Sequence, residues 1–373
     1  MGERCEAVEV MLVVGARPQI VKSAPIIREA ARDAEVEFLV VHTGQHYDFE
    51  MSRIFFDELD LPDPVVDLGV GSGSHAWQTG KMMIGLERTI GELKPDVVLV
   101  PGDTNSTLAG ALAAVKLHVP VAHVEAGARS YDMGMPEEVN RRLTDHCSGL
   151  LFASTENCRN NLMKEGIPEE QVCLSGDTMY DALLRHLPKA AESDVLRRFG
   201  LAEGEYAVLT AHRPENVDNP ETLGDIIEAV IQLRELPIVF PAHPRTTERL
   251  RVTGLLTKVK EAEHVRLVDP VGYHEMLGLV KNAKMVFTDS GGLQKEAFWL
   301  HTLCITFRER TEWVETVKLG ANMLVGNNKE TIVRKVRECL AVEGLEARLK
   351  GLPNPFGDGN ASKKIVEALK EIC

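Results

Sequence analysis

The sequence predicts an α/β protein with two doubly wound, Rossmann-like domains. Short apolar runs rich in β-branched residues alternate along the chain with amphipathic stretches of helical length. Strands that are buried on both faces and alternate with helices are typical of parallel sheets with right-handed crossovers. The runs fall into two successive sets of about six, and 373 residues are enough for two domains with their own cores.

The first set of runs defines an amino-terminal domain, which we expect to cover residues 1–180. Its helices are predicted over residues 75–94 and 104–118, where the apolar positions have helical spacing. Its strands are predicted at residues 9–15, 37–44, 96–103, 119–127, 149–155 and 171–177.

The second set defines a carboxy-terminal, nucleotide-binding domain, which we expect to cover residues 181–360. The polar stretch 187–205 is the predicted linker between the two sets, by its composition and its place. The predicted strands are residues 206–212, 237–243, 264–270, 283–291, 303–307 and 323–326, and the predicted helices are residues 221–236, 274–283 and 329–341.

The composition narrows the classes of partner. Hydrophobic residues make up 44% and charged residues 26% of the chain, as in globular proteins. A formal net charge of -14 argues against nucleic acid, and no apolar run has the length of a membrane span. The seven cysteines are scattered singly, without the spacing of metal ligands. We therefore expect a cytoplasmic protein with reduced thiols, no metal, and no nucleic-acid or membrane partner.

Polar residues gather at the expected carboxyl ends of strands in both sets, where doubly wound sheets bind their ligands. A cleft between two domains is the natural place for such loops to meet, although any α/β protein has polar strand ends. The loops are residues 15–17, 42–46, 102–104, 125–127, 211–213 and 289–292.

The segment TDSGGLQKEA, residues 288–297, predicts an anion site where a strand meets a helix. Ser290 suits the N-cap, and Gly291 and Gly292 let a phosphate approach the backbone amides closely. Glu296 could accept hydrogen bonds from the hydroxyls of a ribose, or it could simply face solvent on a capped helix. The chain has neither a Walker loop nor a G-x-G-x-x-G after a strand, so the usual ATP and NAD fingerprints are missing.

Three basic residues could supply a local positive potential in this acidic chain. Arg17 and Lys22 lie at the first strand-to-helix junction, and Arg213 follows a strand of the second set. Together they suit a pyrophosphate or a developing negative charge. Taken singly, Arg17 and Lys22 are better explained as solvated surface charges.

Three acidic residues suggest proton transfer. Asp103 and Glu125 follow neighbouring predicted strands, and Glu137 begins the helical segment PEEVNRRLTDH. Carboxylates gathered in one place can serve as general acid and base. The alternatives are structural: Asp103 would cap the following helix, and Glu137 would be a favourable charge in the first turn of its own helix.

Two histidines end strands of the second set. His212 could donate to a phosphate or act as an acid, whereas for His243 we prefer a hydrogen bond to loop backbone. No histidine pair has the short spacing of a zinc site, and no G-x-S-x-G elbow of a hydrolase occurs in the chain.

The chain contains, in this order, the segments GARPQIVKSAPI, HTGQHYD, GDTNSTLAGALAA, HVEAGARS, MPEEVNRRLTDH, TAHRPENVD, TDSGGLQKEA, RTEWVETV and NPFGDGNASKKI. Together they resemble the non-hydrolysing UDP-N-acetylglucosamine 2-epimerase family over nearly the whole chain. The resemblance implies the two-domain architecture of GT-B glycosyltransferases, a UDP-sugar in the interdomain cleft, a homodimer, no redox cofactor and no metal. It also implies that a C-terminal helix, residues 361–373, packs back on the amino-terminal domain.

The resemblance implies a role for each residue that matches a family motif. The catalytic carboxylates would be Asp103, Glu125 and Glu137, with His212 near the phosphates. The residues that bind the substrate would be Arg17, Lys22, Arg141, Arg213, the diphosphate cradle Ser290, Gly291 and Gly292, and the ribose-binding Glu296.

Departures from the family pattern leave two substrates open. The best-known members have GTRPE, QEEA and TERPE where this chain has GARPQ, QKEA and TEWVE. These variants look more like relatives that act on UDP-2,3-diacetamido-2,3-dideoxyglucuronate. The substrate is therefore either UDP-GlcNAc or this diacetamido sugar, with the same epimerisation at C2.

The mechanism that the resemblance implies is elimination of UDP across C1–C2 to an enzyme-held 2-acetamidoglucal, followed by re-addition. The carboxylates would supply the base and the acid, and the Ser290 corner would stabilise the departing diphosphate. The rival functions are a GT-B glycosyltransferase, a hydrolysing epimerase, and a nucleotide-sugar sensor without catalysis.

Overall fold

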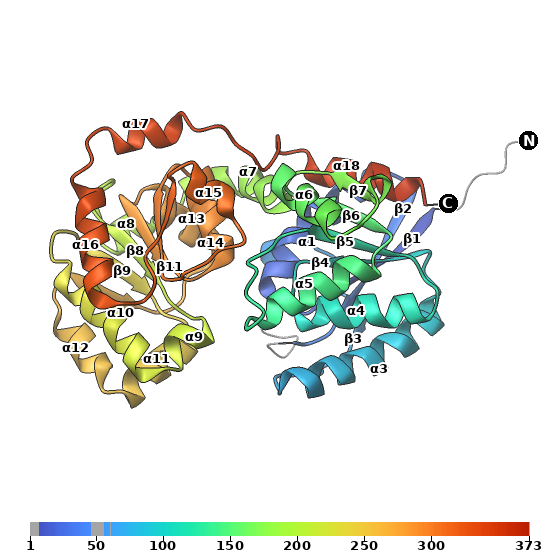
Figure 1. Ribbon diagram of the computed structural model, residues 1–373, viewed down its shortest axis with the longest axis horizontal. Helices are drawn as coiled ribbons and strands as arrows, with labels where there is room; N and C mark the ends of the chain where they lie inside the picture. The colour runs from blue at the N-terminus through green and yellow to red at the C-terminus, as the bar shows by residue number, and fades with distance from the viewer. Residues whose placement is uncertain (1–6, 46–55, 60, 373) are drawn as a thin grey trace, which may run out of the picture. The chain divides into compact units, whose positions relative to one another are not determined.

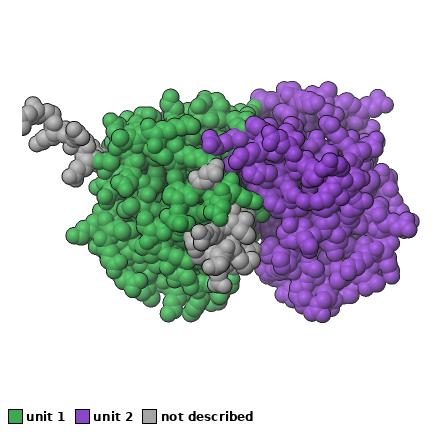
Figure 2. All heavy atoms as spheres, turned by 180° about the vertical axis from the view of Figure 1, so that it is seen from behind, with its two compact units in different colours: residues 1–184, 354–373 green, residues 185–353 purple. Residues whose placement is uncertain are grey.

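The structure, a computed structural model, describes residues 7–45, 56–59 and 61–372 (Figure 1). The chain forms two compact units (Figure 2). Unit 1 is Met1–Leu184 together with Asn354–Cys373, and unit 2 is Arg185–Pro353. Residues 46–48, which complete the predicted loop and the segment HTGQHYD, lie outside the described residues. No helix in the described ranges combines the length and the apolar character needed to cross a membrane.

Among the described residues of unit 1, seven parallel strands form one sheet in the order β3-β2-β1-β4-β5-β6-β7. The order reverses between β1 and β4, so the loops that follow these two strands start side by side at the carboxyl edge. The strands are β1 (Val8–Val14), β2 (Val36–His42), β3 (Val66–Asp67), β4 (Val97–Pro101), β5 (Val121–Ala126), β6 (Leu150–Ala153) and β7 (Val172–Leu174).

Helices cover the sheet of unit 1 (Figure 1). In the core, Met82 and Leu86 of α3 and Ala109 of α4 pack with Met11 of β1 and Val98 of β4. The helices are α1 (Arg17–Ala30), α3 (His75–Leu93), α4 (Asn105–Lys116), α5 (Pro136–Cys147), α6 (Glu156–Lys164), α7 (Thr178–Ala191) and α18 (Ala361–Lys370), with a 3-10 turn at Glu169–Gln171.

The end of the chain belongs to unit 1. Helix α18 lies against α1 and β2. The buried carboxylate of Asp181, on α7, accepts hydrogen bonds from the backbone N–H groups of Ala361 and Ser362 at 3.2 and 2.7 Å. The backbone N–H of Asp177 donates to the carbonyl of Phe356 at 2.9 Å. These contacts attach the segment before α18 and the start of α18 to α7.

In the described part of unit 2, six parallel strands form a sheet in the order β10-β9-β8-β11-β12-β13. Here the order reverses between β8 and β11. The strands are β8 (Ala207–Thr210), β9 (Ile238–Pro241), β10 (Val265–Val268), β11 (Met285–Thr288), β12 (Leu303–Thr306) and β13 (Asn322–Leu324). The helices are α8 (Val195–Arg198), α9 (Pro214–Val217), α10 (Pro220–Gln232), α11 (Pro244–Val252), α12 (Leu255–Glu261), α13 (Tyr273–Lys281), α14 (Gly291–Trp299), α15 (Val314–Lys318), α16 (Lys329–Leu340) and α17 (Leu345–Lys350).

The predicted fold class is confirmed, since each predicted strand and helix is present within a few residues. Strand β3 was not predicted, because two residues are too short to show a pattern. The predicted linker, residues 187–205, contains the end of α7 and the whole of α8 and falls within unit 2. Ala190 and Val195 are buried, which explains why this polar stretch is ordered as helix.

Candidate active site

The predicted site residues fall into two groups, each at the carboxyl edge of one sheet near the point where the strand order reverses. The group in unit 1 is Arg17, Lys22, Asp103, Glu125, Glu137 and Arg141, and the group in unit 2 is His212, Arg213, Ser290, Gly291, Gly292 and Glu296.

Glu125 and Lys22 form a buried ion pair. Lys22 Nζ lies 2.7 Å from Glu125 Oε1, which contradicts the solvated-charge alternative for Lys22. Glu125 has a left-handed φ of 74°, and the register of β5 against β6 shifts at this residue. Such a backbone costs about 1–3 kcal/mol at a non-glycine residue and is often found at functional sites. Arg17, the first residue of α1, is partly buried at the same edge.

Asp103 pairs with Arg141 across the loop that follows β4. Its Oδ2 lies 2.5 Å from Nη1 of Arg141, and its backbone carbonyl accepts from Nδ2 of Asn140 at 2.9 Å. The N-cap of α4 is Thr104, whose hydroxyl accepts from the backbone N–H of Thr107. The capping alternative for Asp103 is therefore wrong, and its carboxylate faces an arginine instead.

Glu137 and Glu138 share the first turn of α5 but differ in burial. Glu137 is half-buried, so the catalytic and the helix-start explanations both remain for it. Glu138 is fully buried and accepts hydrogen bonds from Ser130, Arg141 and Arg142 at 2.8 to 3.1 Å. Burial alone would raise the pKa of Glu138, but these hydrogen bonds lower it below its usual value. We did not select Glu138 from the sequence. Arg141 and Arg142 nevertheless lie three and four residues after it, a spacing that brings side chains together on a helix and could have indicated the contact.

In unit 2 a buried carboxylate that we did not select organises the loop after β8. Asp289 is completely buried and accepts from the backbone N–H groups of His212 and Arg213, each at 3.0 Å, and from Nδ2 of Asn216 at 3.1 Å. Its Oδ1 also lies 3.3 Å from Nδ1 of His212. The His212 side chain is 45% exposed, so its ring is accessible to a ligand while its backbone is fixed.

The start of α14 has the features of an anion site. Ser290 is the N-cap, and its hydroxyl accepts from the backbone N–H of Leu293. A Cβ at Gly291 would lie 2.5 Å from Oε1 of Glu312, so a larger residue there would displace that carboxylate. Glu296 is buried, with an exposed fraction of 7%, so the solvent-facing alternative for it is wrong.

Two of the departures from the family pattern contact each other. Lys295, in QKEA, is completely buried, and its Nζ lies 4.0 Å from the centroid of the Trp313 ring, in TEWVE. Nε1 of Trp313 would in turn lie 3.4 Å from a Cβ at Gly291. The cation–π contact makes the two departures a matched pair beside the start of α14.

His243 has the structural role that we preferred for it. It is the N-cap of α11, and its Nδ1 accepts from the backbone N–H of Arg245 at 3.2 Å. Across the described residues, no three His, Cys, Asp or Glu side chains are grouped as metal ligands would be.

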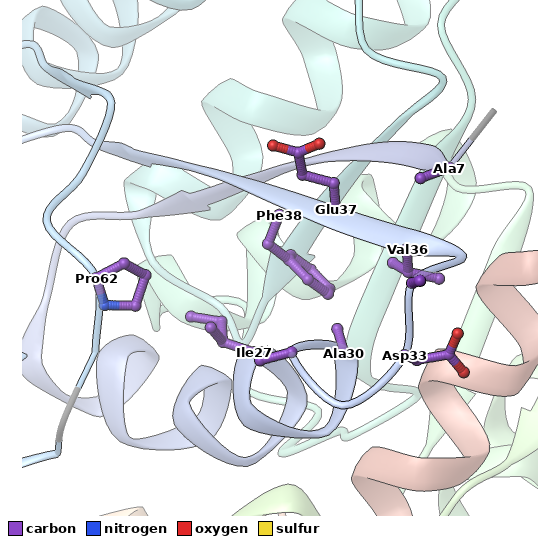
Figure 3. Close-up of a pocket in the computed structure, with 10 residues that line it drawn as sticks. Ala7, Ile27, Ala30, Asp33, Val36, Glu37, Phe38 and Pro62 are labelled. Carbon is purple, nitrogen blue, oxygen red and sulfur yellow. The ribbon is translucent and has the colours of Figure 1, made fainter.

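Figure 3 shows a pocket of unit 1 that lies away from the predicted site. Its volume is about 330 Å³, and the residues that line it include Ile27, Val36, Phe38 and Pro62, together with Asp33 and Glu37. These residues surround the end of α1 and the start of β2, at the amino edge of the sheet. A mostly apolar lining with two acids does not suit an anionic ligand.

Comparison with known proteins gives one consistent answer. The profile of a family described as UDP-N-acetylglucosamine 2-epimerase matches residues 28–370. A UDP-N-acetylglucosamine 2-epimerase of Methanocaldococcus jannaschii is 47% identical over 364 residues, covering 96% of this chain and 98% of that protein. A UDP-2,3-diacetamido-2,3-dideoxy-D-glucuronate 2-epimerase of Pseudomonas aeruginosa is 42% identical over 369 residues, covering 98% and 100%. The crystal structure of a Methanocaldococcus jannaschii UDP-GlcNAc 2-epimerase with UDP-GlcNAc and UDP matches with a TM-score of 0.90 at 46% identity, covering 98% and 99%.

Proposed function

Because this chain belongs to the UDP-N-acetylglucosamine 2-epimerase family, we propose that it interconverts UDP-GlcNAc and UDP-ManNAc without hydrolysing them. The observation that carries the proposal is the pairing of carboxylates with cations where the unit 1 sheet reverses its order. Asp103 faces Arg141, and Glu125 faces Lys22. Carboxylates held in this way can exchange protons with a bound sugar.

We propose that the nucleotide is bound by the residues of unit 2. The backbone N–H groups at the start of α14 would hold the diphosphate, because a helix N-terminus offers unpaired donors and a favourable dipole. Buried Glu296 would accept from the ribose hydroxyls. His212 and Arg213 would donate to the phosphates from the loop that Asp289 holds.

The proposed chemistry is elimination followed by re-addition. A carboxylate removes the proton from C2, the C–H electrons form the C1–C2 double bond, and the C1–O bond breaks with its electron pair leaving on UDP. A carboxylic acid then returns a proton to the other face of C2 while UDP adds again at C1. Asp103, Glu125 and Glu137 are the proposed base and acids, and the α14 corner with His212 and Arg213 stabilises the departing UDP.

A second candidate substrate is UDP-2,3-diacetamido-2,3-dideoxyglucuronate. The Pseudomonas aeruginosa relative favours it, and so do the departures QKEA and TEWVE. Lys295 and Trp313 nevertheless lie beside Gly291, on the proposed nucleotide side, so they give little information about the sugar. We therefore rank UDP-GlcNAc first, and parallel assays with both sugars decide between them.

Proton NMR of UDP-GlcNAc in D2O with the full chain tests the proposed function. We expect the manno isomer to appear with deuterium at C2, because the proton removed by the base exchanges with solvent. Epimerisation without deuterium would contradict the elimination. Free N-acetylmannosamine with UDP would indicate a hydrolysing enzyme, and an unchanged sugar would favour a glycosyltransferase or a sensor.

We also propose that the protein is a cytoplasmic homodimer. Trp77 and Ile84 on α3 and Val115 on α4 are exposed, and exposed apolar groups on neighbouring helices are suited to covering by a second copy. The buried thiols of Cys304 and Cys339 form no disulfide, which fits a reducing compartment. Sedimentation of the full chain tests the dimer, and a monomer at assay concentration would contradict it.

A further inference from the structure

His123 is buried in β5 with an oxygen facing each of its ring nitrogens. Nδ1 lies 2.6 Å from Oδ1 of Asp145, and Nε2 lies 2.7 Å from the backbone carbonyl oxygen of Gly102. The side chain has an exposed fraction of 0%, so water does not take the place of either partner. A carbonyl and an ionised carboxylate can only accept hydrogen bonds.

A neutral imidazole has one N–H and can therefore satisfy only one of these acceptors. Its other nitrogen carries no hydrogen, so the lone pair of that nitrogen would face the lone pair of an oxygen within hydrogen-bonding distance. The two lone pairs would repel each other, and the buried ring has no solvent to relieve this. The imidazolium form donates from both nitrogens and satisfies both oxygens. Burial makes the difference in free energy between the neutral and the protonated ring large, because a hydrogen bond that the protein leaves unmade there is not replaced by one to water.

The proton could instead sit on Asp145, but the surroundings of Asp145 favour its ionised form. Its Oδ2 accepts from the backbone N–H of Gly127 at 3.1 Å and lies 2.7 Å from Nη2 of Arg129. Both of these contacts stabilise a negative charge on Asp145, independently of the state of the ring. Asp145 is therefore a carboxylate, and the proton belongs to the ring.

The charges around the ring balance, which a buried network requires. Arg129 also binds Glu165 through two hydrogen bonds, of 3.0 and 2.7 Å. Two cations, His123 and Arg129, thus face two anions, Asp145 and Glu165. The other charged groups on the packed elements have partners of their own: Lys22 with Glu125, Asp103 with Arg141, Glu138 with Arg141 and Arg142, and His146 near Glu165.

We propose that His123 is an imidazolium that positions the carboxylates of unit 1, an inference that rests on the proposed function. Its Nε2–H holds the carbonyl of Gly102, whose φ of 70° makes the turn into Asp103. Glu125 lies two residues further along the same strand. A charge-assisted hydrogen bond restrains the turn more strongly than a neutral one. Because His123 is buried and acts through the backbone, it is a positioning residue and not a catalytic one.

Nitrogen-15 NMR of the full chain, labelled at histidine, tests the protonation state directly. We expect both ring nitrogens of His123 to carry a proton at about pH 7, because each of them faces an acceptor. Loss of these signals in His123→Gln assigns them. A wild-type spectrum in which either ring nitrogen is unprotonated would overturn the inference, whether or not the chain is an epimerase.

Two substitutions separate the two hydrogen bonds of the ring. In His123→Gln the amide reaches the place of Nε2 and keeps the bond to Gly102, whereas in His123→Asn it reaches only the place of Nδ1 and keeps the bond to Asp145. We expect His123→Asn to lower kcat about 10²-fold, because a displaced turn misplaces Asp103. His123→Gln should lower kcat less, and both variants should bind UDP as the wild type does.

A matched control is His264→Gln in unit 2, where a half-buried ring has one carbonyl acceptor, that of Val230 at 3.2 Å. It should leave kcat unchanged. Equal losses in the two His123 variants, or none in His123→Asn, would overturn the positioning role. An inactive wild type would instead refute the proposed function. If the variants do not fold, the wild-type spectrum, assigned through the backbone resonances of uniformly labelled protein, still decides the protonation state.

Discussion

At the carboxyl edge of unit 1, beside β1 and β4, the carboxylates of Asp103 and Glu125 each face a cation. At the matching edge of unit 2, beside β8 and β11, the carboxylate of Asp289 holds loop backbone instead, and the start of α14 offers backbone N–H groups. The two sheets have the same kind of strand order, so topology does not explain the difference. Paired carboxylates such as Glu125 can take up and release protons, while the amides at the start of α14 can only hold an anion. Under the proposed function, the same kind of sheet would serve proton transfer in unit 1 and nucleotide binding in unit 2.

The largest expected effect is on turnover in unit 1. Glu125→Gln keeps the size of the side chain and an acceptor for Lys22, but removes its charge and its ability to accept a proton. We expect kcat to fall about 10²–10⁴-fold, with UDP affinity close to that of the wild type. Turnover and calorimetric UDP binding are measured on the same preparation, with a thermal melt to exclude unfolding. Nearly normal turnover would remove Glu125 from the mechanism.

The matching experiment in unit 2 should change binding instead. Glu296→Ala removes the proposed acceptor of the ribose hydroxyls, and a hydrogen bond to a charged group contributes about 1.5–3 kcal/mol. We expect weaker UDP binding of that size by titration calorimetry, with kcat at saturating substrate little changed. Glu248→Ala, at an exposed acid of α11, is the control and should bind UDP normally. A loss of kcat without a loss of UDP affinity would contradict the proposal that unit 2 binds the nucleotide while unit 1 transfers protons.

A smaller effect concerns the pH dependence of stability. Folding lowers the pKa of Glu138 below its usual value of 4.5, so its stabilisation is present above that pH and is lost as the pH falls through the lower pKa of the folded state. We expect Glu138→Gln to be less stable than the wild type at neutral pH, with the gap closing on acidification below 4.5. Urea unfolding of both proteins along a pH series measures this gap. A gap that stays constant would show that the charge of Glu138 does not stabilise the α5 start.

The smallest effect is expected at His243. Asparagine caps helices well, so His243→Asn should change the free energy of unfolding by less than about 0.5 kcal/mol and leave UDP affinity unaltered. His212→Asn, at the other strand-end histidine, should weaken UDP binding. Equal affinities of the two variants in calorimetry would mean that neither ring contacts the phosphates.

The sequence predicted the architecture well because buried parallel strands are continuous apolar runs, which are visible without a partner. It could not predict which of several neighbouring polar groups takes which role. Asp103 and Thr104 are both good N-caps, and only the backbone geometry shows that Thr104 caps α4. Glu137 and Glu138 are adjacent acids, and only packing decides which of them is buried.

The residues that our sequence reasoning missed share a cause. Asp289 and His123 act through hydrogen bonds to backbone in loops or strands far away in sequence, and no spacing in the chain records such partners. By contrast, Arg141 and Glu138 are three residues apart on one helix, so the spacing in the sequence is enough to predict their contact. Local partners can be predicted from sequence, whereas partners brought together by a sheet need the fold.

The attachment of the C-terminal segment to Asp181 has a consequence for biosynthesis. Unit 2 is one continuous stretch, Arg185–Pro353, so all of it leaves the ribosome before the final segment does. Unit 1 is discontinuous, and the partners of the Asp181 carboxylate are Ala361 and Ser362, which are made after the whole of unit 2. We therefore expect unit 1, whose synthesis begins first, to complete its folding only after unit 2 has been synthesised.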